Sequence, residues 1–261
     1  MTAGAGGLAI PVVPLAFLAG ACLGSFFNVL IHRLPREGES IIRPGSRCPA
    51  CGRAIKPWEN IPILSFLFLR GKCAGCGERI SWRYPGVELL TAAGFALMAW
   101  GDGIGFPLLR DAVFFSLLVP IVFIDIDHRI IPDELSLGGL MAGLLLAFLP
   151  GGAWRQSLLG AAVGGGILYA TAALYEKATG REGMGGGDVK LVAMIGAFLG
   201  WKGAVLTIFL GSLLGVAGGV WAMRKGQEGL KTAIPFGPYL CVAALLARHL
   251  GESVWGLLLR T

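Results

Sequence analysis

Long apolar stretches separated by short polar segments are the dominant pattern of this chain. A membrane-spanning helix needs about 20 mostly apolar residues, and eight stretches reach or approach that length. They cover residues 8–31, 86–101, 106–126, 134–150, 156–175, 188–201, 203–223 and 235–257. Two of them, 86–101 and 188–201, are short and would form broken or partly inserted helices. The pattern predicts an all-α polytopic membrane protein with about eight transmembrane helices.

The amino-acid composition supports a membrane protein and argues against a soluble one. The 261 residues are 55% hydrophobic and 15% charged, whereas a soluble domain has about 25% charged residues. The net charge of +6 does not indicate nucleic-acid binding, because basic residues concentrate in the cytoplasmic loops of membrane proteins. The first residues, MTAGAGG, lack the basic start of a cleavable signal peptide, so we expect none.

The distribution of basic residues predicts the orientation in the membrane. Of the 22 Lys and Arg residues, 17 lie in segments on one side of the predicted spans, namely 32–85, 127–133, 176–190 and 224–234. The other five lie on or near the opposite side. Because basic loops stay inside, we expect the first side to be cytoplasmic, although the long first segment carries less weight. An even number of spans then puts both termini outside.

Four cysteines in the first polar segment form two C-x-x-C pairs, Cys48 with Cys51 and Cys73 with Cys76. Two pairs at this separation are typical of a zinc ribbon or knuckle, in which four thiolates surround one tetrahedral ion. Two disulfides or four free thiols are the alternatives, and a segment facing the reducing cytosol argues against disulfides. A site filled by four thiolates would be structural.

Acidic residues at the ends of predicted spans are the other candidates for chemistry. Asp125, Asp127 and Asp133 follow one apolar run, and Asp188 opens another. Ionisable residues within a span are costly and indicate function. Two predicted spans separate Asp125 from Asp188, so the chain returns to the same face and the two carboxyl groups can meet. Such a pair can share a proton and activate water.

Three interpretations of these acids remain open from the pattern alone. The first is a catalytic pair, for which Gly185 and Gly187 would supply unusual φ values or allow close backbone approach to Asp188. The second is a proton or ion relay in a transporter. The third is a set of helix caps, since Asp is a preferred N-cap residue and Asp133 follows Pro132 before a helix.

Six motifs in order along the chain resemble those of bacterial type IV prepilin peptidases (leader peptidase/N-methyltransferases), a family of membrane aspartic proteases. The motifs are GSFFNVLIHRLP (24–35), the four cysteines, WRYPGVELLT (82–91), DIDHRIIPD (125–133), GMGGGD (183–188) and IPFGPYL (234–240). In the fourth motif an Asp precedes Ile-Pro by six residues, and this spacing selects Asp125 over Asp127. The fifth motif contains the G-x-G-D signature shared with presenilin-like proteases.

The resemblance implies both an activity and a set of site residues. Asp125 and Asp188 would be catalytic, and Gly185, Gly187, Asp127 and Lys190 would support them. Enzymes of this family cleave the basic leader of prepilins or pseudopilins after a glycine, at the cytoplasmic face of the bacterial inner membrane. Many then methylate the new N-terminus with S-adenosylmethionine. No methyltransferase motif is recognisable here, and residues 32–85 are where we expect that activity.

The sequence thus predicts three parts: a first transmembrane helix (1–33), a cytoplasmic zinc-binding domain (34–85) and a transmembrane protease core (86–261). The main alternative is a proton- or ion-coupled transporter that uses the same aspartates. A transporter commonly has matching halves, and no clear internal repeat is visible. A third possibility is a metal-stabilised scaffold, which would tolerate loss of both acids.

Overall fold

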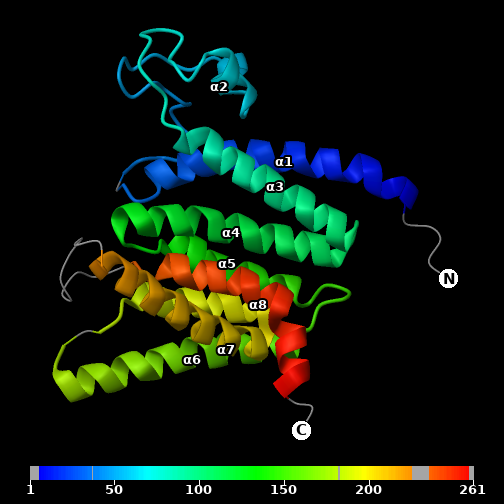
Figure 1. Ribbon diagram of the computed structural model, residues 1–261, viewed down its shortest axis with the longest axis vertical. Helices are drawn as coiled ribbons and strands as arrows, with labels where there is room; N and C mark the ends of the chain where they lie inside the picture. Colours follow the sequence, from blue (N-terminus) through cyan, green and yellow to red (C-terminus); the bar gives the residue numbers. More distant parts are fainter. Residues whose placement is uncertain (1–5, 37, 182, 225–234, 259–261) are drawn as a thin grey trace. The chain divides into compact units, whose positions relative to one another are not determined.

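The computed structural model describes residues 6–36, 38–181, 183–224 and 235–258. The elements are α1 (Gly6–Arg33), η1 (Pro57–Asn60), α2 (Leu64–Phe68), α3 (Arg83–Asp102), α4 (Phe106–His128), α5 (Asp133–Leu146), α6 (Trp154–Thr179), α7 (Gly186–Arg224) and α8 (Gly237–Leu258) (Figure 1). Pairing of extended backbone in the described part is limited to two isolated bridges. The predicted all-α class is confirmed. Residues 1–5, the basic residues of 225–234 and Ile234 of the last motif lie outside the described residues.

Among the described residues, five helices are long and apolar enough to cross a membrane. They comprise Val12–Arg33, Phe106–His128, Trp154–Thr179, Gly186–Arg224 and Gly237–Leu257. The short expected span 86–101 falls in α3, and the expected span 134–150 falls in α5, which has only 14 residues. The two expected spans 188–201 and 203–223 lie in one element, α7, which is interrupted at Gly200. The predicted total of eight spans therefore stays a prediction.

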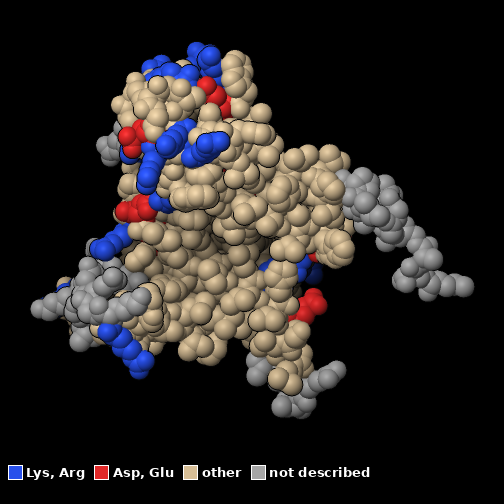
Figure 2. Space-filling view, turned by 45° about the horizontal axis from the view of Figure 1, so that its top comes forward, with Lys and Arg blue, Asp and Glu red and all other residues tan. Residues whose placement is uncertain are grey.

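Large apolar side chains face outward along the helices. Leu97, Trp100 and Leu174 are each more than 70% exposed, at 72%, 79% and 74%. Most of the surface in Figure 2 is accordingly uncharged. Water would disfavour so much exposed apolar surface, whereas lipid tails accommodate it. The protein is a multi-pass membrane protein.

The first compact unit comprises residues 1–120, in which α1 packs along α3 (Figure 1). Glycines on α1 allow this approach. A Cβ at Gly20 would lie 2.8 Å from the Cα of Ala92, and a Cβ at Gly24 would lie 2.7 Å from the Cα of Glu88. Small residues four positions apart commonly permit such contacts between membrane helices. The cysteine segment connects these two helices.

The second compact unit comprises residues 121–261. In it α7 packs against α5, α6 and α8. A Cβ at Gly160 of α6 would clash with the carbonyl oxygen of Gly196 of α7. Next to this contact, Ser157 Oγ donates a hydrogen bond to the Ala197 carbonyl oxygen over 2.6 Å. These contacts hold α7, whose first turn carries Asp188.

The boundary between the compact units falls at residue 120, within α4. The division expected from the sequence, at residues 33 and 85, follows changes in chemical character along the chain rather than packing. That division stays a prediction. Both members of the expected aspartate pair lie in the second unit, and all four clustered cysteines lie in the first.

Candidate active site and metal centre

Asp125 lies near the end of α4 and is only 5% exposed. Its Oδ2 accepts a hydrogen bond of 3.0 Å from the backbone N–H of Gly237, the first residue of α8. A Cβ at position 237 would lie 2.7 Å from that oxygen. The start of α8 reaches the carboxylate only because residue 237 lacks a side chain. An N–H group at a helix N-terminus is well suited to hold a carboxylate.

Asp188 lies in the first turn of α7. The packing around Ile131 relates its position to that of Asp125. Ile131 links the two positions, because a Cβ at Gly187 would lie 3.1 Å from Ile131 Cβ and a Cβ at Gly237 would lie 3.3 Å from Ile131 Cδ1. The predicted meeting of these two acids is therefore consistent with the contacts that Asp125 and Ile131 make at the starts of α7 and α8. Their catalytic role stays a prediction.

The glycines before Asp188 do not have the unusual φ values that the sequence suggested. Glycines with a left-handed φ in the described part do not include Gly185 or Gly187. The expectation of special φ values is wrong for both. Gly187 instead permits the close contact with Ile131, and the nearest atom to a Cβ at Gly185 would be Asp188 Oδ2, at 4.0 Å. Close backbone approach is thus the property that the packing requires of Gly187.

The remaining predicted acids lie around the pair. Asp127 is exposed. Asp133 is the first helical residue of α5, whose N-cap is Pro132, so the expectation that Asp133 is the cap is wrong. Its carboxylate instead accepts from Lys190 Nζ at 2.7 and 2.9 Å. Lys190 therefore joins the starts of α5 and α7, beside the aspartate pair.

Sequence reasoning did not assign a role to Gly237 or Ile131. Gly237 lies in the motif IPFGPYL, and Ile131 lies in the motif DIDHRIIPD. The motifs included these residues but did not show which groups they would contact. The Gly237 amide is 112 residues from Asp125. Only the folded chain shows that this amide, at the start of α8, bonds to the carboxylate near the end of α4.

The four cysteines lie on two backbone turns of the same design. In each turn the N–H and C=O of the first cysteine bond to the residues five and four positions later, Arg53 and Gly52 in one turn and Glu78 and Gly77 in the other. Both glycines have a left-handed φ, 68° and 75°, which glycine adopts without strain. The repeated C-x-x-C-G sequence thus forms two equivalent ligand-bearing turns.

The two turns bring four sulfur atoms into one cluster. The Sγ atoms of Cys48, Cys51, Cys73 and Cys76 all lie within 4.8 Å of one another, and all four thiols are free. Backbone N–H groups of Cys76 and Gly75 lower the pKa of the Cys73 thiol to about 6. This favours the thiolate, which is the form that binds metal. The cluster can hold a metal ion, and the disulfide alternative is wrong for the structure described.

Comparison with known protein families identifies the class of protein to which this chain belongs. Residues 18–101 match the family model of the bacterial Peptidase A24 N-terminal domain. Residues 112–220 match the type IV leader peptidase family. Together with the membrane helices, these matches define a membrane peptidase. No solved structure matches the chain.

Similar proteins that align with most of this chain define its family within that class. A protein of Pseudomonas putida is 37% identical over 93% of this chain and 92% of its own length, and one of Pseudomonas aeruginosa is 39% identical over 92% and 93%. One of Myxococcus xanthus is 44% identical over 83% of this chain and 65% of its own length. All three are prepilin leader peptidase/N-methyltransferases. The chain belongs to this family, and the transporter alternative finds no support.

Proposed function

We propose that the protein cleaves the basic leader of type IV prepilins or pseudopilins after a glycine and then methylates the new N-terminus. The observation that supports the peptidase activity is that Gly237, whose amide bonds to Asp125, and Gly187, which precedes Asp188, both lie against Ile131 in the second unit. The names of the relatives support both activities. Substrates with an apolar segment after the leader suit an enzyme surrounded by lipid.

The acid pair explains cleavage without a covalent intermediate. With one proton shared between Asp125 and Asp188, the ionised carboxylate removes a proton from a water molecule as the water oxygen attacks the glycine carbonyl carbon. The protonated carboxyl group donates its proton to the carbonyl oxygen. When the peptide C–N bond breaks, the amine takes a proton from the pair, and a hydroxyl group of the gem-diol gives its proton back to the pair as the carbonyl bond re-forms, so that the pair again holds one proton. The Gly237 N–H holds one Asp125 oxygen in position throughout.

The proposed topology places this chemistry at the cytoplasmic face of the bacterial inner membrane. Eight spans, with 17 of the 22 basic residues on the inner side, put both termini outside. The leader then stays in the cytosol while the apolar segment of the substrate stays in the bilayer. The scissile bond between them lies at the depth of the aspartate pair.

We assign Zn²⁺ to the four cysteines. Four thiolates suit zinc in a closed tetrahedral site, where the ion ties together the two turns and has no open position for a substrate. The ion would therefore stabilise the cysteine segment. Cys48 is buried and the other three are more accessible, so the cluster lies near the surface of its unit.

Methylation uses the amine that cleavage releases. The deprotonated amine nitrogen forms a bond to the methyl carbon of the sulfonium donor. As this bond forms, the carbon–sulfur bond of the donor breaks and its electron pair stays on sulfur. The methylated nitrogen then loses a proton to water. S-adenosylmethionine supplies the methyl group.

The test of the peptidase assignment is incubation of purified protein with a prepilin, with and without S-adenosylmethionine, followed by intact mass measurement. We expect Asp125→Ala and Asp188→Ala each to abolish cleavage, because neither acid alone can both activate water and protonate the oxygen. Asp127→Ala is the matched control and is expected to cleave, since Asp127 is exposed. Cleavage at the wild-type rate by either of the first two variants would contradict the assignment.

A further inference from the structure

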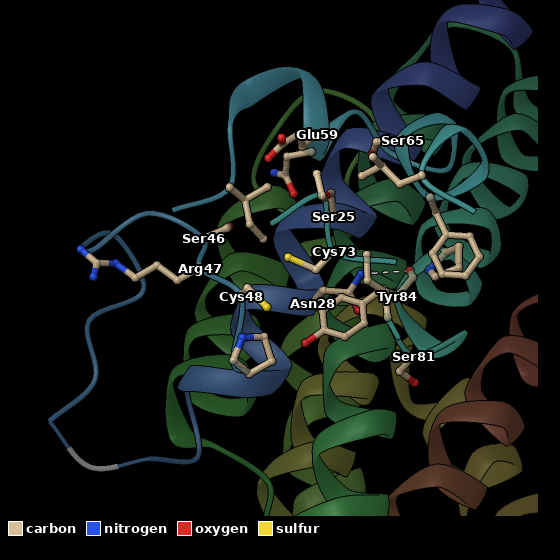
Figure 3. Close-up of a pocket in the computed structure, with 18 of the residues that line it drawn as sticks. Ser25, Asn28, Ser46, Arg47, Cys48, Glu59, Ser65, Cys73, Ser81 and Tyr84 are labelled. Carbon is tan, nitrogen blue, oxygen red and sulfur yellow. Dashed lines mark hydrogen bonds between the residues drawn. The ribbon is translucent and has the colours of Figure 1, made fainter. Parts of the chain in front are cut away.

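The short helix α2, in the segment that connects α1 to α3, has two unlike faces. Ser65 and Phe66 face inward, because they line a cavity of about 440 Å³ between α1, α3 and the cysteine turns, where Figure 3 shows Ser65. Leu64, Leu67 and Phe68 lie on the other side of the helix and are 52%, 60% and 83% exposed. The face of α2 that is turned away from the cavity is therefore entirely apolar.

This helix begins beside the first turns of α3. The backbone N–H of Ile63, directly before α2, donates to Glu88 Oε2 over 2.7 Å. Glu88 lies about 7.5 Å along the helix from Arg83, where α3 begins. The next two residues of α3, Leu89 and Leu90, are exposed. Because α3 packs along the membrane helix α1, these leucines face lipid, and α2 starts at their level.

Strained backbone fixes the direction in which α2 leaves α3. Ile63 has φ of 63° and ψ of −52°, a conformation that β-branched residues rarely adopt. The bond to the buried Glu88 holds one side of the turn, and Phe66 packs on Trp82 with ring centroids 4.7 Å apart. Such strain persists where the surrounding structure imposes it. The outward direction of the apolar face is therefore built into the fold.

Aromatic and basic residues flank the apolar face. Trp82, directly before α3, is 76% exposed, and Trp58 of η1, which contacts α2, is 64% exposed. Arg70 and Lys72 follow α2 and are exposed, and residues 60–77 contain no acid. Tryptophan is enriched at the headgroup level of membranes. Basic residues beside an apolar helix face are attracted to anionic lipids.

These features match a lipid surface. Both ends of the connecting segment continue into α1 and α3, so its distance from the bilayer is limited. Through Trp82 the apolar face of α2 continues toward Leu89 and Leu90 of α3, and the lipid that covers those leucines lies next to it. A protein partner would have to displace that lipid and would gain nothing from the flanking basic residues unless it were acidic.

We propose that α2 is an interfacial anchor, which inserts Leu64, Leu67 and Phe68 into an anionic lipid leaflet while Arg70 and Lys72 contact its headgroups. The anchor goes beyond the proposed cleavage and methylation and does not depend on either. It would hold the cysteine segment against the membrane surface, so that this segment does not move freely in the cytosol.

The test places the photoreactive residue benzoylphenylalanine on this face of the full-length protein. It replaces Phe68 in protein reconstituted into nanodiscs of phosphatidylcholine and phosphatidylglycerol, and irradiation is followed by intact mass measurement. The positive control has the same probe in place of Leu97, which is 72% exposed on α3. The negative control has it in place of Arg47, whose side chain points away from the cavity in Figure 3. We expect lipid adducts at positions 68 and 97 and none at position 47.

Three results would overturn the anchor. The first is a lipid adduct at position 97 without one at position 68. The second is an adduct at position 68 with added prepilin, or with a second copy of the chain, in place of lipid. The third is equal lipid adducts at positions 68 and 47, which would show general contact with lipid. Thermal unfolding reports whether each variant is folded, and the probe in place of Leu64 keeps the test decisive if the variant at position 68 is not.

The choice of lipid tests the role of the basic residues. The adduct yield at position 68 should fall when phosphatidylglycerol is left out, because Arg70 and Lys72 then lose their anionic partners. An unchanged yield would overturn the assignment to anionic lipid. None of these readings uses cleavage or methylation, so failure of the anchor and failure of the proposed function are distinguishable.

Discussion

Glycines control how closely the chain approaches the two acids of the second unit. Gly237 presents its amide to Asp125, and Gly187 packs against Ile131. In both places a methyl group would meet atoms at 2.7–3.1 Å, which is closer than ordinary van der Waals contact. The site thus depends on the absence of side chains as much as on the carboxylates themselves.

We predict that Gly237→Ala lowers the rate of prepilin cleavage about 100-fold, because displacing Asp125 by a fraction of an ångström to 1 Å disturbs the reacting geometry. The measurement is the initial cleavage rate at saturating substrate. Gly138→Ala in α5 is the control, since a Cβ there meets no atom within 4 Å, and it should cleave normally. Equal rates for the two variants would show that the Gly237 contact does not position the acid.

The roles of individual residues could be predicted only in part from the sequence. The spacing of DIDHRIIPD selected Asp125, and the cysteine spacing predicted a cluster, because both patterns are local. The partnership of Asp133 with Lys190, 57 positions apart, and that of Asp125 with Gly237 arise from helix packing. A pattern of apolar and polar residues carries no information about which amide will face which carboxylate.

At the scale of elements, close contact between α6 and α7 sets where the first turn of α7 lies. Gly160 and Gly196 face each other without room for a methyl group, and Ser157 bonds across the same contact. The sequence predicted helices at these places, among them two separate spans, 188–201 and 203–223. The structure agrees in having two helical stretches in α7 that meet at a kink at Gly200, where φ is 71° and ψ is 177°.

Replacement of Gly160 by alanine should destabilise the α6–α7 pair by about 1–3 kcal/mol, the usual cost of overpacking. The unfolding temperature in detergent would fall, and cleavage would weaken as Asp188 moves with α7. Gly166→Ala, also in α6, has no neighbour within 4 Å of its Cβ and should be neutral. Identical unfolding temperatures for both variants would argue against a tight α6–α7 contact.

At the scale of the whole molecule, the two compact units carry different chemistry. Residues 1–120 hold the cysteine cluster and the cavity, and residues 121–261 hold the acid pair. The sequence predicted both sites, because each depends on recognisable motifs. It could not predict the cavity, whose residues come from α1, α3 and the turns and share no spacing, nor the boundary inside α4.

This division predicts separable activities. Cys48→Ser should remove bound zinc and lower methylation, because we expect methylation in the segment that the ion would stabilise, whereas we expect cleavage to depend on the second unit. Zinc content by mass spectrometry and intact mass of the pilin product measure the two effects. Cys22→Ser, a cysteine in α1 outside the cluster, is the control. Unchanged zinc in the Cys48 variant would refute the metal centre.

The distance along the chain between Asp125 and its amide partner also has a consequence for timing. The 112 residues that separate them take on the order of ten seconds to synthesise. During that interval α4 has been made while α8 has not, and Asp125 lacks the N–H that holds it. A nascent chain therefore carries Asp125 and Asp188 before it has the Gly237 amide that bonds to one Asp125 oxygen. We expect full proteolytic activity only after α8 has been synthesised.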